Sequence, residues 1–184
     1  MADFSIIPFN GKTPRIDPSA FIAPGCRIIG DVEIGPEASI WYNCVLRGDV
    51  NFIRVGARTN IQDGSVIHCD SGHGTGGGYP TIIGDDVLIG HLAMVHGTLL
   101  KDRSFVGLGA ITMDGTVIES GGMIAAGGML TPGKTIGANE LWTGRPAKLM
   151  RVLTDEQVAG NMMGVEGYRI LARAHKAENA ARLG

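Results

Sequence analysis

The chain has 184 residues, which suits one good-sized domain, and its formal net charge is −2. This charge gives no basic field that would attract nucleic acid or an anionic membrane, and the longest apolar runs are too short to cross a bilayer. The 29 glycines and an aromatic content of 5% predict many tight turns around an aliphatic core. The three cysteines, and a start without the features of a secretory signal, predict a cytoplasmic protein without a disulfide framework.

Aliphatic residues recur every six positions along most of the chain. One run extends from Ile22 to Phe52, a second starts at Val55 after a slip of three residues, and a third starts at Ile83 and drops one residue before Leu100. No α-helix or antiparallel meander repeats every six residues, whereas a triangular solenoid with three hexapeptides in each coil does. The sequence therefore predicts a left-handed parallel β-helix with these residues pointing into the prism. Small residues, expected near its corners, follow four positions after the first five aliphatic ones: Cys26, Val32, Ala38, Cys44 and Val50.

Two interruptions and one change of pattern divide the chain. The slip near Phe52 predicts a small bulge, and a Gly-rich stretch at about 69–80 predicts a loop inserted into a β-helix domain of residues 1–152. Residues 153–184 are predicted to be helical, because Thr154-Asp155-Glu156-Gln157 has the spacing of a capping box. The apolar side chains of this helix are expected to pack on the solenoid and to cap its open edge.

Two histidines occupy the same position in their repeats. His68 follows the inward Ile67, and His96 follows the inward Val95. The repeat frame places them one coil apart, at the strand spacing of ~4.8 Å, so their side chains should stack. Two stacked imidazoles can converge on one metal ion, because metal–nitrogen bonds of about 2.0–2.1 Å place the nitrogens little more than 3 Å apart.

A third histidine should point elsewhere. His91 lies two places after Ile89, on the preceding face of the coil that contains His96, and a corner separates the two histidines. One solenoid cannot easily bring all three together, but three prisms packed about a threefold axis can. The spacing therefore predicts a homotrimer with three equivalent metal sites, in which His91 meets His68 and His96 of a neighbour.

Polar residues near this column complete the candidate site. Arg47 occupies the same repeat position one coil below His68, and Asp49 lies on the same strand, where the two could fix the register of an interface or form an ordinary salt bridge. Gln62 and Asp63 lie near the same face, and Gln62 could hydrogen-bond a metal-bound water. Three further residues are expected to have lesser roles: Cys69 on the opposite face, His73 as a proton shuttle or without function, and His175 as a solvated helix residue.

Three sequence stretches closely resemble the γ-class carbonic anhydrase family, and the resemblance covers roughly residues 10–152. The stretches are Arg47-Gly48-Asp49-Val50-Asn51, Gly56 to His68 and Gly90 to Gly97. The resemblance implies Zn²⁺, with Fe²⁺ or Co²⁺ as alternatives, bound by His68 and His96 of one subunit and His91 of the next. It implies a zinc-dependent lyase that reversibly hydrates CO₂ to bicarbonate. It further implies that Gln62 orients the hydroxide and that Arg47 pairs with Asp63 or with a neighbour's Asp49.

The chain departs from the family pattern at two places that serve proton transfer. Val50 stands where the archetypal enzyme has a glutamate after its Arg-x-Asp motif, and the loop after His68 has only Asp70 where the enzyme has another glutamate. A second interpretation is therefore a metal-stabilised trimeric scaffold or binding protein with little or no carbonic anhydrase activity. A third is a hexapeptide acyltransferase that uses an acyl-coenzyme A, since that superfamily shares the solenoid but typically uses one catalytic histidine.

Overall fold

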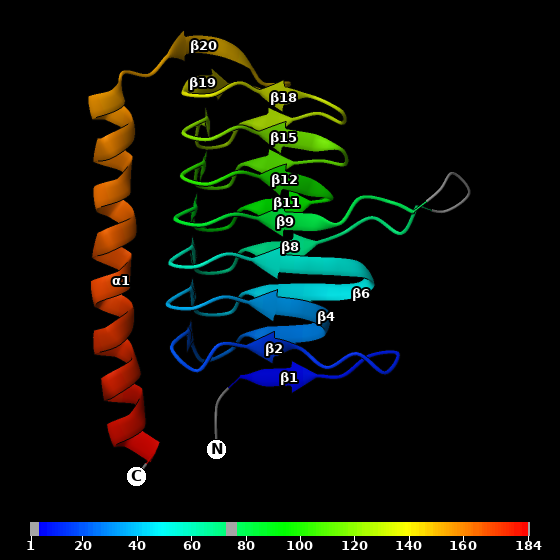
Figure 1. The fold of residues 1–184 in the computed structure, drawn as a ribbon, viewed down its shortest axis with the longest axis vertical. Coiled ribbons are helices and arrows are strands. Elements are labelled where there is room, and N and C mark those ends of the chain that lie inside the picture. The colour runs from blue at the N-terminus through cyan, green and yellow to red at the C-terminus, as the bar shows by residue number, and fades with distance from the viewer. Residues whose placement is uncertain (1–3, 73–76, 184) are drawn as a thin grey trace.

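The computed structural model describes residues 4–72 and 77–183, and side chains as far as residue 179. Its strands wind into a parallel β-solenoid, and a single long helix lies beside it (Figure 1). This is the hexapeptide-repeat left-handed β-helix that the six-residue period predicts, and the prediction of the fold class is confirmed.

The solenoid has three faces, built from short strands joined by tight turns. The first face holds β1 (Ser5–Ile7), β8 (Val66–His68), β11 (Met94–His96), β14 (Ile111–Thr112) and β17 (Met129–Leu130). The second holds β2 (Arg15–Ile16), β9 (Thr81–Ile83), β12 (Thr98–Leu100), β15 (Thr116–Ile118) and β18 (Thr135–Ile136). Two longer strands turn the corner and belong to both of these faces: β4 (Arg27–Ile34) and β6 (Val45–Val55).

The third face ends in a hairpin. Its parallel strands are β3 (Phe21–Ile22), β5 (Ser39–Ile40), β7 (Asn60–Ile61), β10 (Leu88–Ile89), β13 (Phe105–Val106), β16 (Met123–Ile124) and β19 (Glu140–Thr143). The last strand, β20 (Lys148–Val152), pairs antiparallel with β19 and closes the C-terminal end of the prism (Figure 1).

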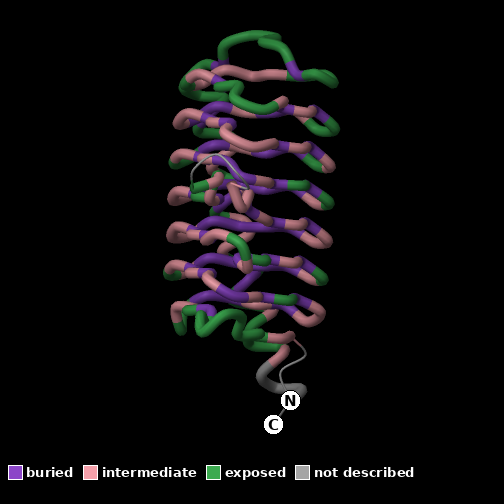
Figure 2. The backbone as a smooth tube through the Cα atoms, turned by 90° about the vertical axis from the view of Figure 1, so that its right-hand side faces the viewer, coloured by how far each residue is buried: buried purple, intermediate pink, exposed green. Residues whose placement is uncertain are grey.

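Aliphatic side chains stacked in register fill the prism. On the first face, for example, Leu46 pairs with Ile67, Ile67 with Val95 and Val95 with Thr112, and all four side chains are completely buried. Figure 2 shows buried residues alternating with less buried ones along every coil. Each such aliphatic side chain contributes roughly 1.5–3 kcal/mol on burial, so the stacked core holds the coils at fixed spacing.

The core departs from the predicted period at one corner. Phe52 was expected to point inward, but Ile53 pairs with Val32 and is completely buried, whereas Phe52 lies under the guanidinium of Arg54, 4.6 Å from its ring centroid. Val50, expected as a small residue near a corner of the prism, does lie where β6 rounds this corner, but its side chain is 46% exposed. The prediction for Phe52 was wrong because β6 crosses the corner as a continuous strand, with a register shift, and the next inward position therefore comes one residue later.

The helix begins as predicted but covers a different part of the solenoid. α1 (Asp155–Leu183) starts with the expected capping box: the Gln157 amide N–H donates to Thr154 Oγ1 at 3.3 Å, and the Thr154 N–H donates to Gln157 Oε1 at 3.1 Å. The helix then runs back along the third face, beside β3, β5 and β7 (Figure 1). It does not cap the open edge, because the β19–β20 hairpin already covers the end from which the helix departs.

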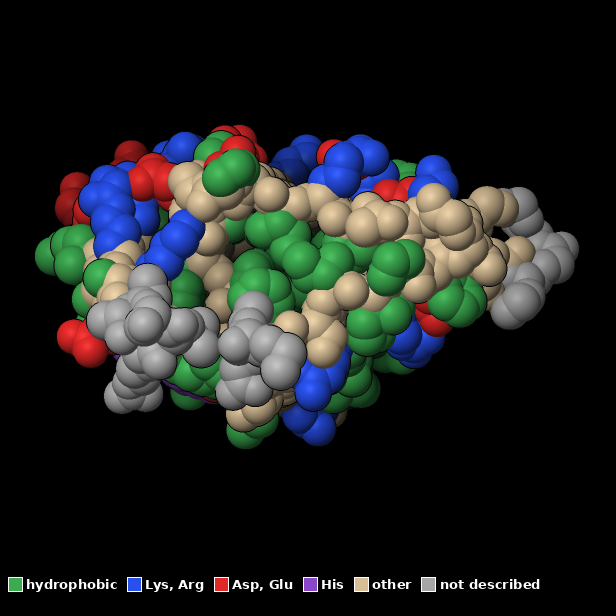
Figure 3. Space-filling model, turned by 90° about the horizontal axis from the view of Figure 1, so that it is seen from below, with side chains coloured by type: hydrophobic (Ala, Val, Ile, Leu, Met, Phe, Trp, Pro, Cys, Tyr) green, Lys and Arg blue, Asp and Glu red, His purple; other side chains and the backbone are tan. Residues whose placement is uncertain are grey.

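The buried side of α1 follows a seven-residue spacing, through Val158, Val165 and Ala172. Met163 and Ile170, expected in the apolar stripe, are instead exposed on the outer side of the helix. At the N-terminal end of the prism, hydrophobic side chains remain visible between basic and acidic ones (Figure 3). Within residues 4–72 and 77–183, no helix has the length and apolar character needed to cross a membrane.

His175 is not the solvated residue that the sequence predicts. Its ring lies 5.2 Å from the ring of Trp41, and its Nδ1 lies 2.8 Å from the hydroxyl of Tyr42. The side of α1 that carries His175 faces the third face of the solenoid, where these aromatic residues gather with Phe21 and Tyr168. His175 therefore helps to hold the helix against the prism.

Candidate metal centre

Two of the three candidate ligands meet at one corner of the prism. β8 and β11 are paired so that His68 and His96 are direct partners in the sheet. Nδ1 of His68 lies 3.0 Å from Nε2 of His96, and the ring centroids are 5.0 Å apart. This separation is close to that of two imidazole nitrogens bound to one tetrahedral metal ion.

The second ring nitrogen of His68 faces a carboxylate. Nε2 of His68 lies 3.0 Å from Asp49 Oδ1, and Arg47 Nη1 donates to Asp49 Oδ2 at 2.6 Å. Burial acts to raise the pKa of Asp49, but the hydrogen bonds from His68 and Arg47 outweigh it and lower the pKa below its ordinary value. Asp49 therefore stays ionised and orients the His68 ring.

His96 has a carboxylate partner that the sequence analysis missed. Its Nδ1 lies 2.6 Å from Oδ1 of Asp114, in the turn that follows β14. The opposite ring nitrogen, Nε2, is the one directed at His68. Both members of the pair thus have one nitrogen toward a carboxylate and the other toward their partner, an arrangement common among metal-ligating histidines.

His91 lies at a different corner, between the third and first faces, and does not join the pair. Its Nδ1 lies 2.8 Å from Asp63 Oδ2, and its Nε2 lies 3.2 Å from the hydroxyl of Tyr168 on α1. Burial, with a smaller effect from Asp63, raises the pKa of Tyr168. Among the residues that the structure describes, no three His, Cys, Asp or Glu side chains of this chain come close enough to hold one metal ion.

The remaining predicted site residues have partners within the chain. Arg47 pairs with its own Asp49, and Asp63 pairs with His91, so the Arg47–Asp63 pair does not form here. Gln62 is buried, and its Nε2 donates to Asn60 Oδ1 at 3.1 Å. Sequence reasoning had no signal for Tyr168, because its contact with His91 depends on where the helix lies.

The inserted loop is anchored beside the histidine pair. Asn51 Nδ2 donates to the carbonyls of Asp70 and Gly77, at 3.1 and 3.0 Å, and so holds both ends of the loop. The ring of Tyr79 lies so close to Gly115 that an added Cβ there would come within 3.0 Å of it. Buried Cys69 stands at the start of the loop, and His73 lies outside the described residues.

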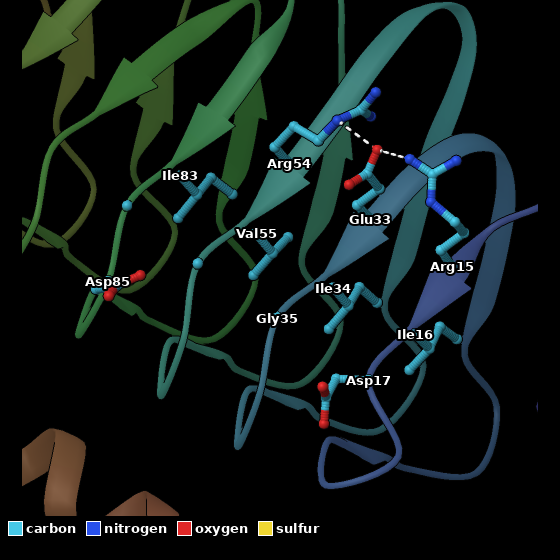
Figure 4. Close-up of a pocket in the computed structure, with 12 residues that line it drawn as sticks. Arg15, Ile16, Asp17, Glu33, Ile34, Gly35, Arg54, Val55, Ile83 and Asp85 are labelled. Atoms are coloured by element: carbon cyan, nitrogen blue, oxygen red, sulfur yellow. Dashed lines mark hydrogen bonds and ion pairs between the residues drawn. The ribbon is translucent and has the colours of Figure 1, made fainter.

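A cleft of about 470 Å³ lies at another corner, between the second and third faces (Figure 4). Three of its charged residues are already paired, since Glu33 accepts from both Arg15 and Arg54, the latter at 3.0 Å. None of the predicted site residues lines it. The histidine pair is therefore the better candidate for chemistry, because it presents ring nitrogens that point at one another.

Comparison with known proteins identifies the family to which the chain belongs. Residues 13–48 match the family model described as bacterial transferase hexapeptide (six repeats). The chain is 44% identical over 153 residues to a carbonic anhydrase of Geobacillus kaustophilus, across 83% of this chain and 81% of that protein. It is 49% identical over 172 residues to gamma carbonic anhydrase 1, mitochondrial, of Arabidopsis thaliana. The chain belongs to the γ-class carbonic anhydrase-like family of hexapeptide-repeat proteins.

The match to the Arabidopsis relative covers 94% of this chain but only 62% of the plant protein. Among solved structures, a hexapeptide transferase family protein from Anaplasma phagocytophilum is 46% identical, with a TM-score of 0.86 over 95% of this chain and 99% of that one. Similar proteins are thus named both as carbonic anhydrases and as hexapeptide transferases. The cytoplasmic location of this chain stays a prediction, because the plant relative is named as mitochondrial.

Proposed function

We propose that the protein reversibly hydrates CO₂ to bicarbonate, as a homotrimer that holds Zn²⁺ between its subunits. The observation that carries the proposal is the pair of facing nitrogens of His68 and His96, 3.0 Å apart, at a corner where the described residues of the same chain supply no third ligand. The relatives named as carbonic anhydrases support the same reaction.

The donor set fits a zinc ion. Each of the three histidines has one nitrogen beside a carboxylate: Asp49 for His68, Asp114 for His96 and Asp63 for His91. In the proposed trimer, His68 and His96 bind the metal with their other nitrogen, and His91 of the partner subunit completes the site. Three imidazoles suit Zn²⁺ and also accept Fe²⁺ or Co²⁺. Bound Zn²⁺ would lower the pKa of a coordinated water to about 7, which makes hydroxide available at neutral pH.

The outer surface of the first face supports trimer formation. Its outward side chains form an apolar column in register, next to the histidine pair: Val45, Val66, Met94, Ile111 and Met129. At the corner that carries His91, Leu92 is 72% exposed and Leu108 is 52% exposed. An apolar column bordered by exposed leucines is typical of a surface that another subunit covers. We propose that the first face packs against the His91 corner of the partner subunit.

The other polar residues have supporting roles in this proposal. Arg47 holds Asp49 in place, Asp63 orients His91, and Gln62 orients the attacking hydroxide. Protons leave by way of external buffer, because Val50 stands where the archetypal enzyme has a glutamate. The same exposed Val50 favours one competing function, a metal-stabilised trimeric scaffold with little or no turnover.

The deciding experiment is stopped-flow CO₂ hydration on protein of measured zinc content, with imidazole buffer as an external proton carrier. We expect turnover that is lost in His96→Ala. The control is His175→Gln, which removes a histidine remote from the pair and should retain both zinc and turnover. A fully metallated trimer without turnover would support the scaffold, and a metal-free monomer would contradict both functions.

A further inference from the structure

Asp114 reaches His96 because one corner of the solenoid changes length between two coils. Val95 pairs with Thr112 before this corner, and Thr98 pairs with Thr116 after it. The coil that contains His96 therefore turns this corner with two residues, His96 and Gly97. The next coil turns it with three, Met113 to Gly115. The extra residue of this next coil places Asp114 over the imidazole of His96, where its Oδ1 lies 2.6 Å from Nδ1.

The local backbone leaves room for this carboxylate. Gly97 has a φ of +52°, and a Cβ at this position would collide with Oδ1 of Asp114 and lie 3.0 Å from Cβ of Tyr79. The N–H of Gly115 donates to the carbonyl of Gly97 at 2.8 Å and fixes the two turns against each other. The backbone next to Asp114 is thus fixed through Gly115, and the Asp114 side chain is 34% exposed.

The contact determines which nitrogen of His96 carries the proton. A carboxylate only accepts hydrogen bonds, so the neutral imidazole must present its N–H from Nδ1 to Asp114. Nε2 then keeps its lone pair, and Nε2 is the atom that faces His68. A metal ion binds the lone pair of a neutral imidazole.

We propose that Asp114 is a positioning residue of the metal site, which holds the His96 ring and its Nδ1–H tautomer so that Nε2 is free to bind the metal. This inference rests on the proposed function. Loss of a carboxylate that orients a metal-ligating histidine typically weakens metal affinity about 10- to 100-fold.

The test compares Asp114→Asn with wild type by two measurements that do not depend on turnover. The first is the Zn²⁺ dissociation constant, from competition with a chromophoric chelator, for which we expect about 10- to 100-fold weaker binding in the variant. The second is the ¹⁵N chemical shifts of the His96 ring in the metal-free protein. We expect Nδ1 of His96 to be protonated in wild type, and a mixture of protonated and unprotonated Nδ1 in Asp114→Asn.

A matched control separates positioning from loss of charge. Glu119→Gln removes one negative charge close to Asp114 in the sequence, from a side chain that pairs with Lys101 and not with a histidine. We expect it to bind Zn²⁺ as wild type does. Equal Zn²⁺ affinity in wild type and Asp114→Asn, or an Nε2–H tautomer in wild type, would overturn the role of Asp114 and leave the proposed function intact. A wild type that binds no Zn²⁺ would instead overturn both.

Discussion

The Nδ1 atom of His68 lies 3.0 Å from the Nε2 atom of His96, although 28 residues separate the two histidines in the chain. The solenoid produces this proximity because each coil stacks directly on the one below, and the pairing of Ile67 with Val95 fixes the register. The side chains that meet in this way are held by a core that changes little when a ligand binds. The two ring nitrogens are therefore already close together before any ligand binds.

Subunit complementation tests whether the site is shared. His91→Ala and His96→Ala should each be inactive as a homotrimer. In a mixed trimer, however, an intact His68–His96 pair of one variant can meet His91 of the other. Random mixing in equal amounts should restore about a quarter of the wild-type sites. Zinc content and CO₂ hydration of the co-refolded mixture measure this recovery, and its absence would show that His91 does not act across an interface.

The two partners of His91 should have opposite effects on metal binding. Tyr168 occupies Nε2 in the free chain, so Tyr168→Phe should leave zinc affinity unchanged or raise it up to about fivefold, which corresponds to one modest hydrogen bond. Asp63 orients the ring through Nδ1, so Asp63→Asn should weaken zinc binding about 10- to 100-fold. Titration with a competing chelator measures both. Weaker binding in Tyr168→Phe would mean that the phenol supports the site.

The exposed leucine beside His91 should be essential for assembly. Leu92→Asp places a charge in the proposed interface, which should cost about 2 kcal/mol or more per interface and shift the trimer toward monomers. Sedimentation velocity together with zinc analysis should show monomers that have lost their metal. Leu171→Asp, on the exposed side of α1, is the matched control and should remain trimeric. Trimers that persist in Leu92→Asp would place the interface on another face.

Acid should loosen the helix from the solenoid through Glu37. Its carboxylate pairs with Arg173 and, at 3.9 Å, with Arg169, and the hydrogen bond from Arg173 holds the pKa of Glu37 below its ordinary value. A lowered carboxyl pKa adds stability above the ordinary value of about 4.3, and this stability is lost as the pH falls through the lowered pKa. The protection factors of the α1 amides, which correct for the intrinsic pH dependence of hydrogen exchange, should therefore fall below about pH 4. Glu37→Gln should already exchange faster at neutral pH and should lack this acid-dependent fall.

The repeat pattern predicted most of the stacked strands of the solenoid, but little about the corner turns that join them. The aliphatic period was sufficient to predict that His68 stacks on His96. The residues that point into the prism stack from coil to coil, and they thereby fix which residues pair in the sheet. The period misplaced Phe52, since a strand that rounds a corner has no fixed turn length. It does not predict the contact of Asp114 with His96, because the period alone does not say which corner loses the residue before Leu100. The structure shows that the corner at His96 is one residue shorter than the corner of the next coil.

The length of the prism controls where the helix meets it. α1 starts only after the last coil has closed, and it then runs back down the third face (Figure 1), where its Tyr168 contacts His91. Ile118 and Ile136 are partners in the sheet, one coil apart. Excision of residues 119–136 would therefore remove one coil, join Ile118 to Gly137, and leave the register of all earlier strands unchanged. The helix would then start one strand spacing of ~4.8 Å lower, which is roughly three residues of helical rise. Tyr168 would then no longer lie opposite His91. The number of coils therefore determines which residue of the helix contacts each corner of the solenoid.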